Sequence, residues 1–316
     1  MIRDTAEMKT YRSDGYNYNF RKSDGYFERW GATREDDPQF SPFGCEIADI
    51  ELSRGGCYGT GTPERPKLCQ YCYKSNTSDA PENMTLETFK TVLGKLGKQL
   101  TQVAFGITSI GANPDFLEIM RHCRSEGVIP NFTTSGSDLD DEFLNKLPGL
   151  VGAVAVSYHG DKDLCFNTVE RLLNVGIKQT NIHCVTVDYQ KTLEFIQAVA
   201  GNMEDGLKLN ALVLLSLKPK GRAKKLSNVL EDEFNYLVHT AQQLNVPLGF
   251  DSCSAHRAEK VFPAKFHSMI EPCESFLMSI FLDYRGMAHP CSFSEGEDIW
   301  GDGIDVVNCK DFLQDV

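Results

Sequence analysis

Ile47-Ala48-Asp49-Ile50-Glu51-Leu52, followed by Cys57 and then Cys69-Gln70-Tyr71-Cys72, is the stretch that most narrows the fold and chemistry of this chain. The first segment alternates apolar and polar residues, which predicts a β-strand that leads directly into Cys57. The three cysteines are spaced C-x11-C-x2-C, and Gly59 to Lys67 form an insertion rich in Gly and Pro. Three thiolates can hold three irons of a [4Fe–4S] cube and leave its fourth iron open for chemistry.

Zinc is the alternative for the same cysteines, because C-x2-C pairs are also typical of zinc sites. A structural zinc site needs a fourth ligand, and no His or Cys follows Cys72 at the usual spacing. Cys45 or a distant residue is a candidate for that ligand. The triplet by itself therefore leaves iron–sulfur and zinc open.

The composition is that of a globular protein: 316 residues, of which 41% are hydrophobic, are ample for one large core or two smaller ones. No apolar run is long enough to span a membrane, and Met1 to Glu7 contain no apolar signal-peptide core. We therefore expect a soluble, cytoplasmic protein. The cytosol keeps thiols reduced, so the 11 cysteines are expected to be free or metal-bound rather than paired.

The formal net charge of −12 argues against broad binding of nucleic acid, whose affinity depends on neutralised phosphates. The one basic stretch runs from Lys218 to Lys225. It is either a solvated loop after a strand or a site that recognises a carboxylate or phosphate at the mouth of a barrel.

Apolar runs and helical patterns alternate along most of the chain. Residues 1–44 have no clear period and are expected to form an extended arm that packs on the main body. Repeated strand–helix units predict an α/β fold, a partial (β/α)6-type TIM barrel over residues 45–252, with function at the C-terminal ends of its parallel strands. Runs such as Ala211 to Leu215 suit strands buried on both faces. Strands are expected at 47–52, 102–107, 128–134, 152–158, 179–187, 208–217 and 247–252, and helices at 84–100, 114–126, 140–147, 163–175, 190–201 and 230–244.

Tyr71, directly before the last cysteine of the triplet, makes this segment resemble the radical SAM superfamily, whose usual signature is C-x3-C-x2-C with an aromatic residue at that place. The longer first gap departs from the signature. Thr108-Ser109-Ile110-Gly111 stands where the family carries Gly-Gly-Glu-Pro, without the glutamate. Asn131 to Gly136 and Ala155 to Gly160 resemble the family's T-x-G and V-S-x-D-G strand ends, and the resemblance runs in order over residues 45–310.

The resemblance implies a radical SAM enzyme. A [4Fe–4S] cluster on Cys57, Cys69 and Cys72 would bind S-adenosylmethionine (SAM). Reductive cleavage of SAM would give a 5′-deoxyadenosyl radical, which takes hydrogen from a substrate, either a peptide or protein or a small metabolite. A flavodoxin or ferredoxin would supply the electron. The residues expected to contact SAM are Tyr71, Ser109, Gly111, Thr134, Ser157, Lys218 and Arg222.

Cysteines return near the C-terminus, and Cys273-x12-Gly286-x4-Cys291 resembles the opening of a SPASM/twitch auxiliary-cluster domain. Phe281 to Phe293 read as a short hairpin with its turn at Asp283 to Gly286. The dense cysteine block of a full SPASM domain is absent, so the resemblance implies one auxiliary cluster at most, within residues 253–316. Its ligands would be Cys253, Cys273, Cys291 and Cys309, and zinc is the rival occupant.

A second class of function stays open. The altered Gly-Gly-Glu-Pro segment and the stretched cysteine spacing also suit a non-catalytic iron–sulfur or zinc-binding module on a degenerate scaffold of the same kind. Iron content together with SAM cleavage would separate the two.

Overall fold

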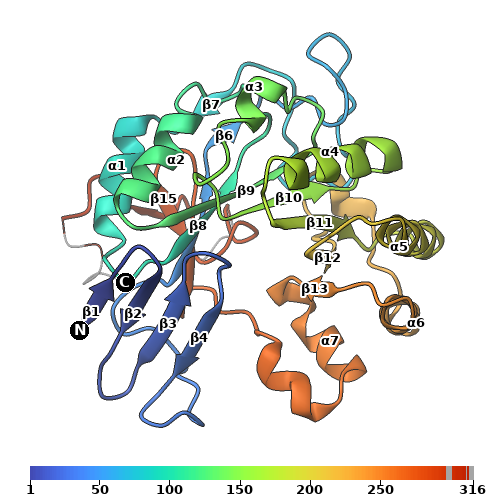
Figure 1. Cartoon of the computed structure of the whole chain (residues 1–316). Helices are drawn as coiled ribbons and strands as arrows, with labels where there is room; N and C mark the ends of the chain where they lie inside the picture. The colour runs from blue at the N-terminus through green and yellow to red at the C-terminus, as the bar shows by residue number, and fades with distance from the viewer. Residues whose placement is uncertain (297–300, 311, 313–316) are drawn as a thin grey trace.

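The computed structural model describes residues 1–296, 301–310 and 312. Its main sheet contains parallel strands that lie side by side in chain order (Figure 1). Because consecutive parallel strands end at the same edge, the loops after them are brought together there. These strands are β5 (Ile47–Glu51), β8 (Gln102–Gly106), β9 (Ile129–Thr134), β10 (Ala153–Ser157), β11 (Gln179–Val185), β12 (Ala211–Leu215) and β13 (Leu248–Phe250).

Helices connect these strands, and the expected strand–helix repeats are confirmed. Several begin at side-chain caps: Thr85 accepts a bond from the Thr88 amide at 3.1 Å, and Asp140 accepts one from the Phe143 amide at 2.7 Å. The α/β fold with a parallel-strand sheet is therefore as predicted. The helices are α1 (Leu86–Lys95), α2 (Phe116–Ser125), α3 (Asp141–Leu144), α4 (Lys162–Asn174), α5 (Tyr189–Glu204) and α6 (Glu231–Gln243).

Strand burial differs from the expectation in one respect. In β12, Leu212 and Leu214 are completely buried, whereas Ala211, Val213 and Leu215 stay partly accessible. The prediction that this run is buried on both faces is wrong, because helices cover only the outer face of the sheet (Figure 1). The inner face is left accessible and carries polar side chains such as Ser157 and His183, which are neighbours in the register of β10 and β11.

The predicted C-terminal hairpin is present as β14 (Ser279–Leu282) and β15 (Met287–His289), followed by β16 (Ile304–Asp305). β14 pairs in parallel with β5, so the hairpin extends the main sheet. Between β13 and β14 the chain forms η2 (Ser252–Ser254), α7 (Ala255–Val261) and η3 (Ala264–Met269). The domain boundaries at 44/45 and 252/253 stay predictions.

The N-terminal region is the main local correction. An extended arm was expected, but β1 (Ile2–Asp4), β2 (Met8–Tyr11), β3 (Asn17–Arg21) and β4 (Phe27–Trp30) form an antiparallel sheet of their own. Tyr18 and Phe20 alternate along β3 and are completely buried. The Tyr18 hydroxyl donates to the carbonyl of Gln99 at 2.7 Å, which joins this sheet to the main body. None of the helices in the described part of the chain combines the length and apolar character that a membrane span requires.

Arg29 fixes the N-terminal sheet to the body through buried charges. Its guanidinium lies 3.0 Å from the Glu46 carboxylate and 2.6 Å from that of Glu274. Replacing Arg29 with Met should lower the free energy of unfolding by about 3–5 kcal/mol, because Glu46 would keep a buried charge without its partner. Urea unfolding followed by circular dichroism measures this. Arg121→Met is the control, since that exposed pair with Glu118 should contribute under about 1 kcal/mol; equal effects would contradict the account.

Candidate functional site

The segment from Gly55 to Asp79, here called the cysteine loop, lies across the C-terminal ends of the parallel strands. Its base is closed by the short pair β6 (Ser53–Arg54) and β7 (Glu82–Asn83). After β8, the hydroxyls of Thr108 and Ser109 donate to the carbonyls of Gly55 and Gly56 at 2.6 and 2.9 Å.

The end of β9 holds the loop in a second place. The hydroxyls of Ser135 and Ser137 both donate to the carbonyl of Gly59, each at 2.9 Å. Neither serine was singled out in the sequence, although both fall in the loop after a strand end that was. The loops after β8 and β9 therefore hold the cysteine loop in the same way, through hydroxyl groups that donate to its backbone carbonyls.

Tyr71 joins the loop to the end of β10. Its hydroxyl lies 2.9 Å from the carbonyl of Tyr158 and 2.8 Å from Nδ1 of His159, and its ring stacks on that of His159 with centroids 5.6 Å apart. Burial lowers the pKa of His159 to about 4, so the imidazole is neutral at pH 7. Tyr71 can then donate to the Tyr158 carbonyl and accept from His159 in its Nδ1–H tautomer.

Arg222, in η1 (Gly221–Lys225) after β12, holds the loop from the other side. Its Nε donates to the carbonyl of Cys69 at 2.9 Å and its Nη1 to that of Asn76 at 2.8 Å. Its backbone amide donates to the carbonyl of Cys72 at 3.1 Å. The buried Nη2 has no hydrogen-bond partner in the described chain, so one donor of the guanidinium remains available for another group.

The thiols of the triplet influence one another. Burial raises the pKa of the Cys69 thiol to about 12, and the nearby Cys72 adds to the rise. Burial also raises the pKa of Cys57, again with a contribution from Cys72. Cys72 therefore lies close to both other thiols. Three thiols on one anchored loop are the donor type that a [4Fe–4S] cluster takes, although no group of His, Cys, Asp or Glu in the described residues is already arranged to hold a metal ion.

A charge network that the sequence did not suggest joins the cysteine loop to β5 and the C-terminal segment. Arg54 contacts Glu51 at 2.8 Å and also contacts Glu295, while Lys74 lies 3.5 Å from Glu51 and pairs with Glu295. The two cations, Arg54 and Lys74, and the two carboxylates, Glu51 and Glu295, are each partly or fully removed from solvent, and they are equal in number. The network fixes the end of the loop beside the inner face of the sheet.

The other expected SAM contacts lie along the same edge. Ser109 bonds the loop, Gly111 has open space around it, and Ser157 lies on the inner face of β10. The Thr134 hydroxyl accepts a bond from the Gly136 amide at 2.9 Å, which caps the turn. The Lys218 ammonium forms an ion pair with the Asp251 carboxylate at 3.0 Å.

Asp138 was missed by the sequence analysis. It accepts a hydrogen bond from the backbone amide of Ile110, within the segment where the resembling family has a glutamate. Burial raises the pKa of Asp138, and the backbone bonds from Ile110 and Gly111 oppose the rise. The loop after β9 thus brings a carboxylate to the strand end of β8, which spacing along the chain does not reveal.

The second cysteine set is spread over the fold. Cys253 follows β13; burial raises the pKa of its thiol, Lys218 opposes the rise, and Cys273 adds a small contribution to it. Cys291 begins the turn after β15, and its amide bonds the Ser294 hydroxyl at 3.1 Å. Cys309 follows β16, and its carbonyl accepts a bond from Lys95 at the end of α1 at 2.7 Å. Among the described residues no group of three or more His, Cys, Asp or Glu side chains is arranged to hold a metal ion, so the ligand role of this set stays a prediction.

Gly59 occupies a backbone conformation that only glycine adopts easily in this setting. Its φ is +61°, and an added Cβ would meet the carbonyl of Lys67 at 2.0 Å. Gly59→Ala should loosen the cysteine loop by about 1–3 kcal/mol, which speeds trypsin cleavage after Lys67 by about tenfold or more. Gly94→Ala is the control, because nothing lies near that position in α1. Cleavage rates that match between the two variants would contradict this description of the loop.

No protein-family model matches the chain, and no curated protein matches it in sequence. Solved structures do match its fold. The crystal structure of Streptococcus suis SuiB bound to precursor peptide SuiA aligns over 99% of this chain and 88% of SuiB, with a TM-score of 0.69 and 13% identity. The protein anSMEcpe with bound AdoMet aligns over 85% of this chain and 77% of its own, with a TM-score of 0.59 and 14% identity.

The FeFe-hydrogenase maturase HydG from Carboxydothermus hydrogenoformans aligns over 78% of this chain and 60% of its own, with a TM-score of 0.52 and 14% identity. A further SuiB structure is bound to S-adenosylmethionine. At these identities the likeness establishes a shared fold, the α/β arrangement with a parallel-strand sheet found in radical SAM enzymes.

Proposed function

We propose that the chain is a radical SAM enzyme that acts on a peptide. The premise is the fold, which it shares with proteins whose structures hold SAM. The observation that carries the proposal is the cysteine loop, which is held across the ends of β8, β9, β10 and β12. Side chains that follow β8, β9 and β12 bond its carbonyls, and its own Tyr71 bonds the Tyr158 carbonyl and His159 after β10. A loop tied to so many strand ends keeps its thiols at the functional edge of the sheet.

Cys57, Cys69 and Cys72 are the residues that would hold the cluster. When bound, a [4Fe–4S] cluster with an open iron supplies one electron that cleaves SAM to methionine and a 5′-deoxyadenosyl radical, which takes a hydrogen atom from a substrate C–H bond to give 5′-deoxyadenosine. An external donor such as flavodoxin or ferredoxin would supply the electron. Because the thiols have raised pKa values, loading the site must release their protons to solvent.

The residues around the loop have roles that their contacts support. Arg222 and the serines after β9 position the thiols, and Tyr71 with neutral His159 closes the loop against β10. Asp138, Ser109 and Gly111 stand where an ammonium group of SAM would be bound by backbone carbonyls and a carboxylate. The polar inner face, including Ser157, remains accessible to ribose and substrate. Thr134 and Lys218 complete the expected set, though their present bonds are internal.

A peptide substrate is favoured over a small metabolite because two of the matched proteins have structures with peptides: SuiB with its precursor peptide, and anSMEcpe with bound AdoMet and a peptide. For the second cysteine set we propose an auxiliary cluster or zinc ion on Cys253, Cys273 and Cys291, with Cys309 as the fourth ligand. Phe293, two residues after Cys291, lies against Lys218 of the loop after β12, which supports a shared site for Cys253 and Cys291.

An anaerobic assay tests the proposal. The chain is reconstituted with iron and sulfide, reduced with dithionite and given SAM, and 5′-deoxyadenosine is measured by mass spectrometry with iron and zinc counted on the same sample. Cleavage with about four irons per chain supports the first cluster alone, and about eight supports both. Bound zinc without cleavage would instead favour the non-catalytic binding module.

A further inference from the structure

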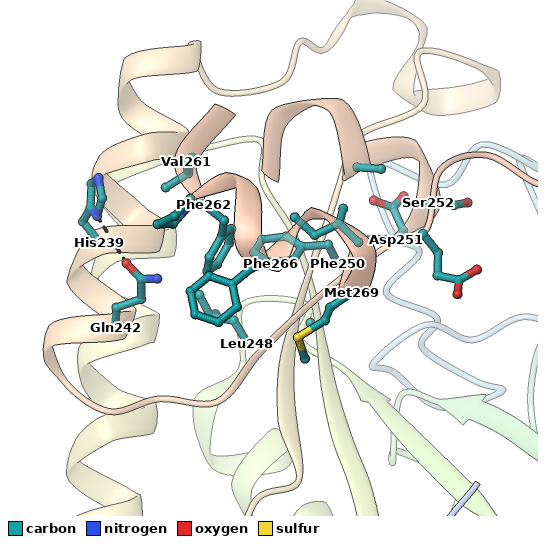
Figure 2. Close-up of a pocket in the computed structure, with 15 residues that line it drawn as sticks. His239, Gln242, Leu248, Phe250, Asp251, Ser252, Val261, Phe262, Phe266 and Met269 are labelled. Atoms are coloured by element: carbon teal, nitrogen blue, oxygen red, sulfur yellow. Dashed lines mark hydrogen bonds between the residues drawn. The ribbon is translucent and has the colours of Figure 1, made fainter. Parts of the chain in front are cut away.

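A cavity of about 800 Å³ lies along the outermost parallel strand, between β13, α6 and the α7–η3 segment. Figure 2 shows apolar side chains in its middle, with His239 and Gln242 on one side and Asp251 and Ser252 on the other. No residue of the triplet or its anchors lines it. Its central apolar residues are Leu248, Phe250, Val261, Phe262, Phe266 and Met269.

The cavity follows the edge of β13 rather than one face of it. Leu248, Gly249, Phe250 and Asp251 are consecutive and all line the cavity. Side chains of successive strand residues point to opposite faces, so all three residues of β13 can line one space only where the backbone edge borders it. In the described chain β13 pairs with β12 alone, which leaves its outer backbone groups facing the cavity.

The apolar wall of the cavity is open to solvent on one side. Phe266 is 40% exposed and Met269 is 77% exposed, although both are large apolar residues. Apolar side chains gathered at a concave, accessible place are typical of a binding site. Free backbone groups beside them supply the hydrogen-bonding partners that an extended peptide needs and that a purely apolar small molecule would leave unused.

Position along the strand also matters. Asp251 lies where β13 ends, and it accepts a bond from Lys218 of the loop after β12. That loop continues into Arg222, which holds the cysteine loop. A strand added at β13 would therefore run toward the edge of the sheet where the thiols lie.

Charge at one end of the cavity favours a cationic residue in the occupant. Glu271 lines the cavity and lies 3.8 Å from Arg29. Arg29 is closer to Glu46 and to Glu274, and it also contacts Asp37. One guanidinium is thus shared by four carboxyl groups, and Glu271, the farthest of them from Arg29, lines the cavity and is placed to contact a cation of the occupant.

We propose that this cavity binds a segment of the peptide substrate, which pairs as an added strand with β13, places an apolar side chain against Phe250, Phe262 and Phe266, and sets a Lys or Arg near Glu271. The proposal rests on the proposed function for the identity of the peptide as substrate. Strand addition to an exposed sheet edge gives affinity through backbone bonds and selectivity through pockets for alternate side chains.

Selection of peptides tests the site. Random 12-residue peptides displayed in a library are selected on the full-length chain, and the best is synthesised with a fluorescent label for anisotropy titration. Phe266→Ala should weaken its binding by about tenfold and Glu271→Gln by about threefold to fivefold. Leu230→Ala, at a 71% exposed position outside the cavity, should leave binding unchanged. Thermal unfolding of all three variants checks that they remain folded.

Backbone pairing is tested with two forms of the same peptide, each N-methylated at alternate positions. Only one edge of an added strand faces β13, so one form should lose binding by tenfold or more while the other stays within about threefold. The proposal is overturned if no peptide is enriched, if both forms bind equally, or if Phe266→Ala instead dissolves a dimer seen by sedimentation. SAM cleavage is measured alongside without peptide: cleavage with no peptide site defeats only this inference, whereas a peptide site without cleavage defeats the proposed function.

Discussion

Replacing Cys72 with Ala should abolish formation of 5′-deoxyadenosine and remove the iron held by the cysteine loop. Burial raises the pKa of both the Cys57 and the Cys69 thiols, and Cys72 is the one thiol of the triplet that adds to the rise at both. Its loss would leave two thiols that cannot hold a cube with three protein ligands. The expected fall in cleavage is at least about 100-fold, since loss of outer-shell partners alone costs about 10–100-fold at metal sites.

Cys123→Ala provides the matched control for this experiment. Cys123 is a cysteine in α2 that is completely buried in the hydrophobic core. That variant should keep its iron and its cleavage activity and lose only some stability, because a small cavity is left in the core. Both are measured by iron analysis and mass spectrometry after anaerobic reconstitution. Retained cleavage in the Cys72 variant would remove the basis for the ligand assignment.

Replacing Arg222 with Met should reduce iron incorporation and SAM cleavage together, by about 10–100-fold. The guanidinium donates to two carbonyls of the cysteine loop, and hydrogen bonds from a charged donor each contribute about 1.5–3 kcal/mol. Methionine keeps an unbranched apolar stem but donates no hydrogen bond, so the loop should open. Faster trypsin cleavage after Lys67 would report that opening without relying on activity.

Two comparison variants test whether the guanidinium of Arg222 positions the cysteine loop. Lys225→Met removes a cation from the same η1 segment at an exposed position and should leave iron and cleavage unchanged. Arg222→Lys keeps the charge but cannot reach both carbonyls in the planar geometry of a guanidinium, so it should restore iron binding only in part. Full iron content with normal trypsin resistance in Arg222→Met would contradict a positioning role.

The strand–helix repeat could be predicted from the sequence because each element carries its own signal. The alternation of Ile47 to Leu52, the Thr85 cap and the apolar run of β12 are local patterns, and the structure confirms the elements they predict. The N-terminal sheet was missed although Tyr18 and Phe20 alternate along β3. Its strands pair mainly with one another, and the bonds that fix it to the body reach residues such as Gln99 far along the chain.

The residues predicted for the site lie along the strand ends, and their role there stays a prediction; the contacts that hold them could not be predicted. Arg222 bonds Cys69 across 153 positions of sequence and Ser135 bonds Gly59 across 76, and no local pattern records such pairs. The network of Glu51, Lys74 and Glu295 is hidden for the same reason. The cavity beside β13 depends on where α7 and η3 pack, which periodicity within each segment cannot specify.

Electron paramagnetic resonance of the dithionite-reduced chain, with and without SAM, tests the central claim most directly. If Cys57, Cys69 and Cys72 hold a [4Fe–4S] cluster with an open iron, the reduced protein should give the signal of a one-electron-reduced cube, and SAM should change that signal by binding the open iron. The Cys253→Ala, Cys273→Ala and Cys291→Ala triple variant should keep the SAM-sensitive signal. Zinc in place of iron at Cys57, Cys69 and Cys72, or a cluster signal that SAM leaves unaltered, would contradict the account.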